Sequence, residues 1–475
     1  MSEVLSASRV ATLVGDFDRS PSYLGLADAL RLLVRDGRIT TGSRLPSERE
    51  LAVALEVSRT TATRAYAELQ ERGYAEARRG SGTFTRVPGG RGAIADRALN
   101  PHTGEDVINL SCAAPIAPPG LAAAYDAALA ELPRYLTDHG YYPAGLPVLQ
   151  QAIATTYDER GLATDPDQIM VTAGSLSAAA IVAQSQTRPG DRIVVENPVY
   201  PNATAALGRQ GARLVGVPVD PEGWDLAAVA ATVRQAAPRL AYLVADFQNP
   251  TGHLMTDAQR EQYAAVLTAS HTLAVVDEAH QMLALEGQPM PRPFAAYAPD
   301  TISLGSASKA FWGGLRIGWI RAPRARVESL LSGRVTLDLG APVLEQLVLV
   351  HLLREREAIL AAQRARLREQ RDRLVTAMRE LLPEWRFRLP GGGLALWCEL
   401  PAPLASTVVL EAERRGVAVA PGPVFSVDGG LGRFVRIPWT RPADELADGV
   451  ARLAEAWTAA QDSPDAPASR RLTVA

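Results

Sequence analysis

One lysine stands apart in a chain that otherwise uses arginine for its basic residues. Lys309 is the only lysine among the 49 basic residues, and it lies in the Ser- and Gly-rich stretch 303–319. An ε-amine that is desolvated or close to other cations can lose its proton and attack an aldehyde, which a guanidinium cannot do. This suggests a Schiff-base lysine. The alternative is a solvated surface lysine, and composition alone does not decide between the two.

Two polar residues that follow apolar runs could bind the edge of a ring-shaped cofactor. Asp277 comes directly after the very apolar run 272–276, where a partly desolvated carboxylate needs a cationic partner. A protonated pyridine nitrogen would be such a partner, and the ring would then act as an electron sink. Asn249 follows another apolar run and could donate a hydrogen bond to the ring oxygen.

Two further stretches could bind the rest of such a cofactor. Gly174, Ser175 and Leu176 form a turn before a helix that is expected to start near Ser177, and free N–H groups at a helix N-terminus bind phosphate. Many strand-to-helix turns look like this one, so the turn alone is weak evidence. Tyr200 could stack on a ring, although a Tyr that anchors a loop is commoner.

These residues need a scaffold that brings them to one edge. Short apolar runs alternate with helical stretches from residue 107 onward, and the runs predict strands at Ile169–Thr172, Arg192–Val195, Arg213–Val217, Ala241–Ala245, Leu273–Val276 and Ile302–Leu304. Such alternation is typical of an α/β fold with a mostly parallel sheet. Ligands bind such sheets beyond the carboxyl ends of the strands, which is where the candidate residues lie.

Residues 107–460 resemble the fold-type I pyridoxal phosphate (PLP) aminotransferases. The matching motifs are Ser306-x-x-Lys309 with Arg316 and Gly318, Asn249-Pro-x-Gly252, and Asp277-x-Ala279. The resemblance implies a Schiff base between PLP and Lys309, with Lys309 and Asp277 as the catalytic pair. It implies cofactor binding by Gly174, Ser175, Leu176, Tyr200, Asn249, Asp277, His280, Ser306, Ser308, Lys309, Arg316 and Tyr141.

A smaller C-terminal subdomain is expected at about residues 380–460, after a charged helical stretch at 355–379. Strands are predicted at 386–388, 393–399, 417–420 and 433–437, followed by a helix at 443–457. The aminotransferase resemblance implies that Arg436 binds the α-carboxylate of an effector or substrate, with Arg433 as the nearby competitor. The tail 461–475, rich in Ser, Ala and Pro, is expected to be disordered.

Residues 1–86 are predicted to form a winged helix-turn-helix. Apolar spacing predicts a helix at 23–34, Ser47 and Glu50 a capping box that opens a second helix, and Ser58 a cap for a third that runs to about residue 72. Residues 73–84 alternate around glycines and predict a hairpin. Arg78 and Arg79 at its tip could enter a minor groove. The alternative is a small helical domain with a solvated charged face.

This segment resembles the GntR-type winged helix through its sequences at 42–52, 57–61, 65–69 and 80–83. The candidate DNA-binding residues are Arg44, Arg49, Ser58, Arg59, Thr60, Arg64, Arg78, Arg79 and Gly80. Residues 87–106 lack apolar periodicity and are rich in Pro, Gly and Arg, which predicts a flexible linker.

The two parts together resemble the MocR-type bacterial transcription regulators. The resemblance implies a homodimer, usually head-to-tail, that binds two half-sites of double-stranded DNA and senses PLP or an amino acid that takes the place of Lys309 on PLP. The alternative is an active aminotransferase or lyase with an appended DNA-binding module. The complete set of winged-helix motifs favours the regulator.

Three positions depart from the patterns of these families. His280 stands where aminotransferases have a Tyr that bonds the ring oxygen, and it could bind that oxygen, titrate near neutral pH, or be purely structural. Pro201 and Asn202 follow Tyr200 where GABA sensors carry a ligand-binding Arg, which argues against a GABA-type ligand. Either Tyr141 or Tyr142 could reach the phosphate of a partner subunit, and Tyr141 is the slight favourite.

Charge, cysteine content and the length of the apolar runs limit which other classes of protein the chain could belong to. The formal net charge is -3, but residues 1–100 hold 15 Arg against 12 acidic residues, which permits an anionic partner at that end. Cys112 and Cys398 lack metal-ligand spacing, so neither a zinc site nor a disulfide framework is expected. The apolar runs are too short to span a membrane, and no signal-peptide pattern opens the chain. We therefore expect a cytoplasmic protein without a metal site.

Overall fold

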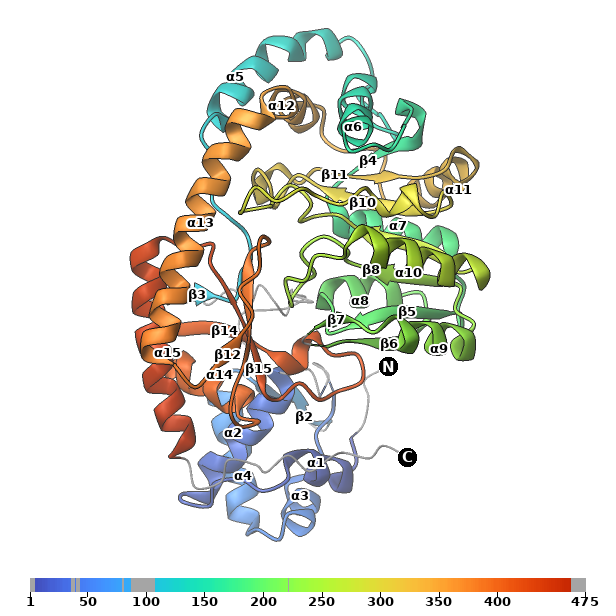
Figure 1. Ribbon diagram of the computed structural model, residues 1–475. Helices are drawn as coiled ribbons and strands as arrows, with labels where there is room; N and C mark the ends of the chain where they lie inside the picture. Colours follow the sequence, from blue (N-terminus) through green and yellow to red (C-terminus); the bar gives the residue numbers. More distant parts are fainter. Residues whose placement is uncertain are drawn as a thin grey trace.

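The structure is a computed structural model that describes residues 5–35, 39, 43–78, 81–86, 107–220 and 222–462. The predicted linker 87–106, Arg79 and Gly80 at the hairpin tip, and the tail beyond residue 462 lie outside the described residues. Figure 1 shows an N-terminal helical unit in blue next to a small orange and red subdomain, with a larger green and yellow α/β layer beside it.

The N-terminal unit is a winged helix-turn-helix. Its elements are α1 (Ala7–Val14), α2 (Ser22–Arg35), α3 (Glu48–Ala54), α4 (Arg59–Glu71) and an antiparallel hairpin of β1 (Ala75–Arg78) and β2 (Gly82–Thr85). The capping box of Ser47 and Glu50 is present, and Ser58 caps α4 as predicted. Helix α1 was not predicted; of its eight residues, Val10 and Val14 are buried in the core and Ala11 and Leu13 pack against it.

The large layer contains an eight-stranded sheet in the order β4-β11-β10-β9-β8-β5-β6-β7. Its strands are β4 (Ile169–Thr172), β5 (Arg192–Asn197), β6 (Arg213–Asp220), β7 (Gly223–Trp224), β8 (Leu240–Leu243), β9 (Leu273–Asp277), β10 (Ile302–Ser306) and β11 (Gly318–Arg321). The pairs from β6 through β10 are parallel, whereas β11 runs antiparallel to both of its neighbours. The predicted mostly parallel sheet is confirmed.

Helices cover both faces of this sheet, because alternate strand residues point to opposite sides. Ile193 and Val195 pack with α7 (Ser175–Gln186), α8 (Pro201–Gly208) and α11 (Arg324–Arg334), whereas Val194 packs with α9 (Leu226–Ala236) and α10 (Asp257–Ala269). At the β4 end, α5 (Leu121–Glu131), α6 (Pro147–Glu159) and α12 (Val343–Arg354) form a further core. Within the described ranges, no helix has the length and apolar character needed to cross a membrane.

The small subdomain is a five-stranded sheet in the order β12-β13-β15-β14-β3, packed on helices. The strands are β12 (Arg386–Phe387), β13 (Ala395–Glu399), β15 (Phe434–Pro438), β14 (Val417–Pro421) and β3 (Ile108–Leu110); the helices are α13 (Arg356–Leu381), α14 (Ala405–Arg414) and α15 (Ala443–Gln461). Strand β3 was not predicted. It comes from the start of the α/β region and pairs in parallel with β14.

Short 3-10 helices complete the connections between these elements. They are η1 (Leu132–Tyr135), η2 (Pro166–Gln168), η3 (Phe294–Ala296), η4 (Gly313–Leu315) and η5 (Gly422–Phe425). Both cysteines are free thiols, with Cys398 fully buried in the core of the small subdomain.

Candidate functional site

The first part of the site is a cradle at the start of α7. The helix begins at Ser175, two residues earlier than predicted, because Gly174 takes a positive φ of 94° and serves as its N-cap. A Cβ on Gly174 would come within 2.7 Å of Nη2 of Arg316. Position 318, next to the cradle, requires a glycine, since a Cβ there would lie 2.6 Å from the backbone nitrogen of Ser175. A helix N-terminus beside a guanidinium is suited to a phosphate dianion.

The strand that ends at Ser306 supplies the other side of this cradle. Ser306 is the last residue of β10 and pairs with Gly318 across the ladder to β11. Its hydroxyl accepts a hydrogen bond of 3.2 Å from the backbone N–H of Ser308, and both serines are buried. The predicted residues Gly174, Ser175, Ser306, Ser308 and Arg316 are therefore gathered at one edge of the sheet, whereas the Leu176 side chain is 38% exposed.

Lys309 lies at the carboxyl edge of the sheet and is partly buried. Its Nζ donates a 2.9 Å hydrogen bond to the carbonyl of Ala113, which follows β3. The positive charge of Lys309 is close enough to influence two neighbours: it acts to lower the pKa of Asp277 and that of His280, alongside the other effects described below. A lysine among these groups is not the solvated surface residue of the alternative interpretation.

Asp277 ends β9 and is buried, as the sequence indicated. Its Oδ2 accepts a 2.7 Å hydrogen bond from the hydroxyl of Tyr242, and its Oδ1 accepts one of 2.8 Å from the N–H of Ala279. Burial raises the pKa of Asp277, while the two donors and Lys309 act in the opposite direction. This carboxylate is anchored on one side and could hold a cationic ring nitrogen on the other.

Arg436 reaches the site from the small subdomain. It is 2% exposed, its Nη1 donates a 3.2 Å hydrogen bond to Oδ1 of Asn249, and its Nη2 donates to the carbonyl of Ser111. Its guanidinium also lies 4.9 Å from the ring centroid of Phe425. The competitor Arg433 is exposed and donates to the carbonyl of Pro401, away from Asn249.

His280 is buried and neutral. Its Nδ1 lies 2.9 Å from the carbonyl of Phe247, which can only accept, so Nδ1 carries the proton. Burial lowers the pKa of His280 to about 4. His280, Asn249 and Ala113 line one pocket together with Gly393. Of the possibilities left open for His280, titration near neutral pH does not fit this environment, and its unprotonated Nε2 remains a hydrogen-bond acceptor.

A buried network of charges supports the loops that carry Asn249 and His280. Arg160 lies 2.7 Å from Glu278 and 3.6 Å from Asp246, and Arg260 lies 2.5 Å from Asp246. Opposite charges this close hold the network together in spite of its burial. Among the described residues, no group of three or more His, Cys, Asp or Glu is suited to a metal ion.

The second candidate site is the exposed face of the winged helix. Ser58, Arg59 and Thr60 are exposed at the start of α4, as are Arg44, Arg49 and Arg78 elsewhere on the unit. Arg64 is also exposed, but its guanidinium lies 3.6 Å from the centroid of the Tyr23 ring. Arg78 pairs with Glu76 and lies over Phe84. At the start of α4, Arg59 and Thr60 are therefore exposed, whereas the hydroxyl of Ser58 is engaged in the helix cap.

Comparison with known proteins identifies both parts of the chain. Residues 22–85 match the gntR family of bacterial regulatory proteins, and residues 120–453 match aminotransferase class I and II. The uncharacterized HTH-type transcriptional regulator YdcR of Escherichia coli is 31% identical over 87% of this chain and 94% of its own length. The chain belongs to the MocR-type transcription regulators.

Enzymes resemble the larger part of this MocR-type chain. The 2-aminoadipate transaminase of Thermus thermophilus is 32% identical, over 61% of this chain and 75% of the enzyme. The crystal structure of LysN, an alpha-aminoadipate aminotransferase of the same species complexed with N-(5'-phosphopyridoxyl)-L-leucine, aligns with a TM-score of 0.69 at 28% identity, covering 75% of this chain and 93% of LysN. The fold-type I aminotransferase fold is confirmed.

Two tyrosines that the MocR resemblance singled out differ in their surroundings. Tyr141 is 58% exposed, whereas the hydroxyl of Tyr142 donates a 3.3 Å hydrogen bond to Asp138. Tyr200, the predicted ring stacker, precedes α8, and its hydroxyl accepts a 2.9 Å hydrogen bond from Asn202. Tyr141 is therefore the more accessible of the pair.

Sequence reasoning missed several groups of the MocR-type pocket. The carbonyls of Ser111, Ala113 and Phe247 accept hydrogen bonds from Arg436, Lys309 and His280, but a backbone oxygen leaves no signal in a residue type. Tyr242 did leave a signal. A Tyr inside the apolar run 240–245 needs a buried partner for its hydroxyl, and a carboxylate at the end of a neighbouring strand is the obvious one.

Proposed function

We propose that this MocR-type regulator holds PLP on Lys309 and uses it to sense an amino acid or PLP itself. The single observation that carries the proposal is that a buried carboxylate, a helix N-terminus beside a guanidinium and a buried arginine lie around Lys309. PLP, when bound, supplies an aldehyde that condenses with amines and a ring that withdraws electrons.

The residues present fit that cofactor. The cradle of Gly174, Ser175, Ser306 and Arg316 would bind the phosphate, since a side chain on Gly174 would fill it. Asp277 would keep a proton on the ring nitrogen, and Tyr242 keeps that carboxylate in place. LysN, which shares the fold, was crystallised with a phosphopyridoxyl adduct of leucine, and this supports the same class of ligand here.

Arg436 would bind the carboxylate of an amino acid effector. Its Nη1 donates to Asn249 and its Nη2 to Ser111, both neutral carbonyl oxygens that an anionic carboxylate could replace. An amino acid that displaced Lys309 and engaged Arg436 would bind one arrangement of the pocket better than another. Such differential binding is what shifts a conformational equilibrium.

The regulator would bind DNA as a homodimer. We infer a head-to-tail arrangement in which the exposed Tyr141 reaches the phosphate of the partner, and in which two winged helices bind two half-sites. We place the DNA-binding domain at 1–86, the linker at 87–106, the effector domain at 107–460 and its small subdomain at about 380–460, in a cytoplasmic protein.

Trapping the cofactor tests the proposal. The chain has one lysine, so incubation with PLP and reduction with borohydride should add one phosphopyridoxyl group to the peptide that contains Lys309, as mass spectrometry would report. Lys309→Ala should lose both the adduct and the visible absorbance. An adduct confined to the N-terminal amine would contradict the proposal.

DNA binding is tested with a matched pair of arginine variants. Arg59→Ala should abolish binding to the promoter of a neighbouring gene, while Arg209→Ala, exposed on the large domain, should not. Both should keep the PLP absorbance. Unchanged binding by Arg59→Ala would show that α4 has been assigned the wrong role.

An active aminotransferase is the second candidate, because Lys309, Asp277 and Arg436 are all in place. Assays with common amino acids and a keto acid acceptor decide between the two. Turnover on the order of 1 per second or faster is typical of a working enzyme and would overturn a purely regulatory role.

A further inference from the structure

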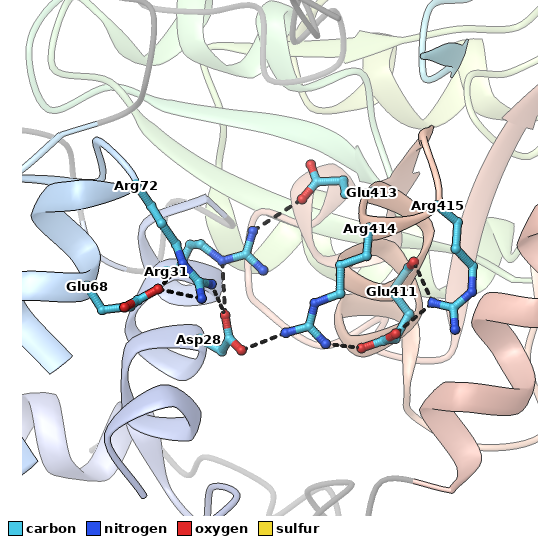
Figure 2. Close-up of polar contacts among 8 residues, drawn as sticks. All are labelled: Asp28, Arg31, Glu68, Arg72, Glu411, Glu413, Arg414 and Arg415. Atoms are coloured by element: carbon cyan, nitrogen blue, oxygen red, sulfur yellow. Dashed lines mark hydrogen bonds and ion pairs between the residues drawn. The ribbon is translucent and has the colours of Figure 1, made fainter. Parts of the chain in front are cut away.

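The winged helix touches the small subdomain through a compact group of ion pairs, shown in Figure 2. Asp28 on α2 is its centre. One carboxylate oxygen of Asp28 lies 2.8 Å from Arg72 of the winged helix, and the other lies 2.8 Å from Arg414 at the end of α14. A second pair joins the two units, since Arg31 lies 3.3 Å from Glu413.

The two crossing pairs have opposite polarity. An acid of the winged helix, Asp28, pairs with a base of α14, Arg414, whereas a base of the winged helix, Arg31, pairs with an acid of α14, Glu413. Any rearrangement that placed Asp28 against Glu413, or Arg31 against Arg414, would bring like charges together. Complementarity of this kind fixes the register of a contact more than it adds to its affinity.

Neighbouring charges hold several of the crossing residues in position. Asp28 lies 3.4 Å from Arg31 and 2.8 Å from Arg72, which is itself 2.6 Å from Glu68, and Arg414 pairs with Glu411 on α14. Arg31 and Asp28 are 9% and 17% exposed. The Arg31–Glu413 pair is therefore partly desolvated, whereas the side chain of Arg414 is 48% exposed, so the first pair carries more weight than an isolated surface pair and the second carries less.

The buried apolar cores of the two units are separate. In the described parts of the chain, the buried core of the winged helix and that of the small subdomain share no residue. A contact held by charge rather than by apolar area weakens as salt is added. It is suited to being made and released.

The contact leaves the DNA-binding end of α4 exposed. Glu68 and Arg72 lie toward the far end of the helix from Arg59, roughly 14 Å and 20 Å away at 1.5 Å per residue. On the other side, β14 begins at Val417, just after α14, and its Ala420 pairs with Arg436 on β15. The surface that holds the winged helix thus lies on the helix that leads directly into the sheet that carries the arginine of the pocket.

We propose that α14 is a docking surface for the winged helix of the same chain, and that the ion pairs around Asp28 and Arg414 form a salt-sensitive latch that orients this unit. The latch would carry movements of the small subdomain to the DNA-binding helix. That last step rests on the proposed effector site, whereas the docking itself does not.

A zero-length cross-link tests the docking. Arg414→Lys places an amine beside Asp28 in a chain whose other lysine lies in the pocket, and a carbodiimide then couples that amine to carboxylates in contact with it. We expect an intrachain cross-link between the peptides that contain positions 414 and 28. It should disappear with Asp28→Asn and fall several-fold at high salt.

Arg324→Lys is the matched positive control, since Arg324 also touches two carboxylates, Asp165 and Asp167, within the large domain. If this control cross-links while position 414 couples only to Glu411, or only to a second chain, the proposal is overturned. The experiment needs neither PLP nor DNA, so its failure is separate from failure of the proposed function.

The orienting role has its own test. Arg414→Glu should weaken binding to a two-half-site promoter by about 2- to 5-fold, the range expected for one ion pair, and leave binding to a single half-site unchanged. Arg324→Glu should change neither. An equal loss on single half-sites would overturn the orienting role.

Discussion

Replacement of His280 should flatten the pH dependence of stability on the acidic side. His280 is 6% exposed, and burial lowers its pKa from 6.5 to about 4, with the charges of Lys309 and Arg436 acting in the same direction. The folded chain therefore binds this proton less readily than the unfolded chain does. The resulting stability is complete above about pH 6.5 and is lost as the pH falls toward 4.

The magnitude follows from these two values. At pH 5 the unfolded histidine is almost fully protonated and the folded one is not, which costs about 2 kcal/mol of folding free energy relative to pH 7.5. His280→Gln has no titrating group, and its amide can still donate to the carbonyl of Phe247. The variant should lose about 2 kcal/mol less than the wild type between these pH values.

Urea unfolding of the full chain, followed by tryptophan fluorescence at pH 7.5 and pH 5, measures this difference. His139→Gln is the control, because the side chain of His139 is 64% exposed. The reasoning is refuted if His280→Gln loses as much stability as the wild type, or if His139→Gln gains the same advantage.

Two further substitutions test the packing around the site. Asp246→Asn leaves the buried arginines of its network without their shared partner and should lower the free energy of unfolding by 3–5 kcal/mol, whereas Asp300→Asn, in an exposed pair, should cost less than about 1 kcal/mol. Gly305→Ala should cost at least 1–3 kcal/mol, because its Cβ would lie 1.9 Å from the Trp319 indole, while Gly313→Ala has open space and should be nearly neutral. Denaturant midpoints at pH 7.5 measure both pairs, and equal effects within a pair would contradict the structure.

Local chemistry explains what could be predicted from the sequence. The capping box of Ser47 and Glu50 and the cap at Ser58 are short-range hydrogen bonds, so residue types three apart sufficed to place α3 and α4. The parallel strands were predicted for a similar reason, since buried strands read as continuous apolar runs. Their carboxyl ends then placed Asp277 and Asn249 near one another.

Long-range pairing explains what could not be predicted. Strand β11 starts at Gly318, only two residues after Arg316, and its place between β4 and β10 depends on residues far away in the sequence. The contact between Asp28 and Arg414 joins residues 386 positions apart. The neutral state of His280 likewise depends on the Phe247 carbonyl and on burial, neither of which is visible in the residue type.

The position of β3 has a consequence for how the chain folds during synthesis. Ile108 pairs with Val417, so the strand that directly follows the linker has its partner more than 300 residues later. The ribosome makes the chain from its N-terminus, and domains fold as their sequences emerge. The winged helix and most of the large sheet can fold before β14 exists. Nascent chains should therefore acquire the DNA-binding fold well before Ser111 and Ala113 are held beside Arg436 and Lys309, so an incomplete chain could occupy DNA without a formed pocket.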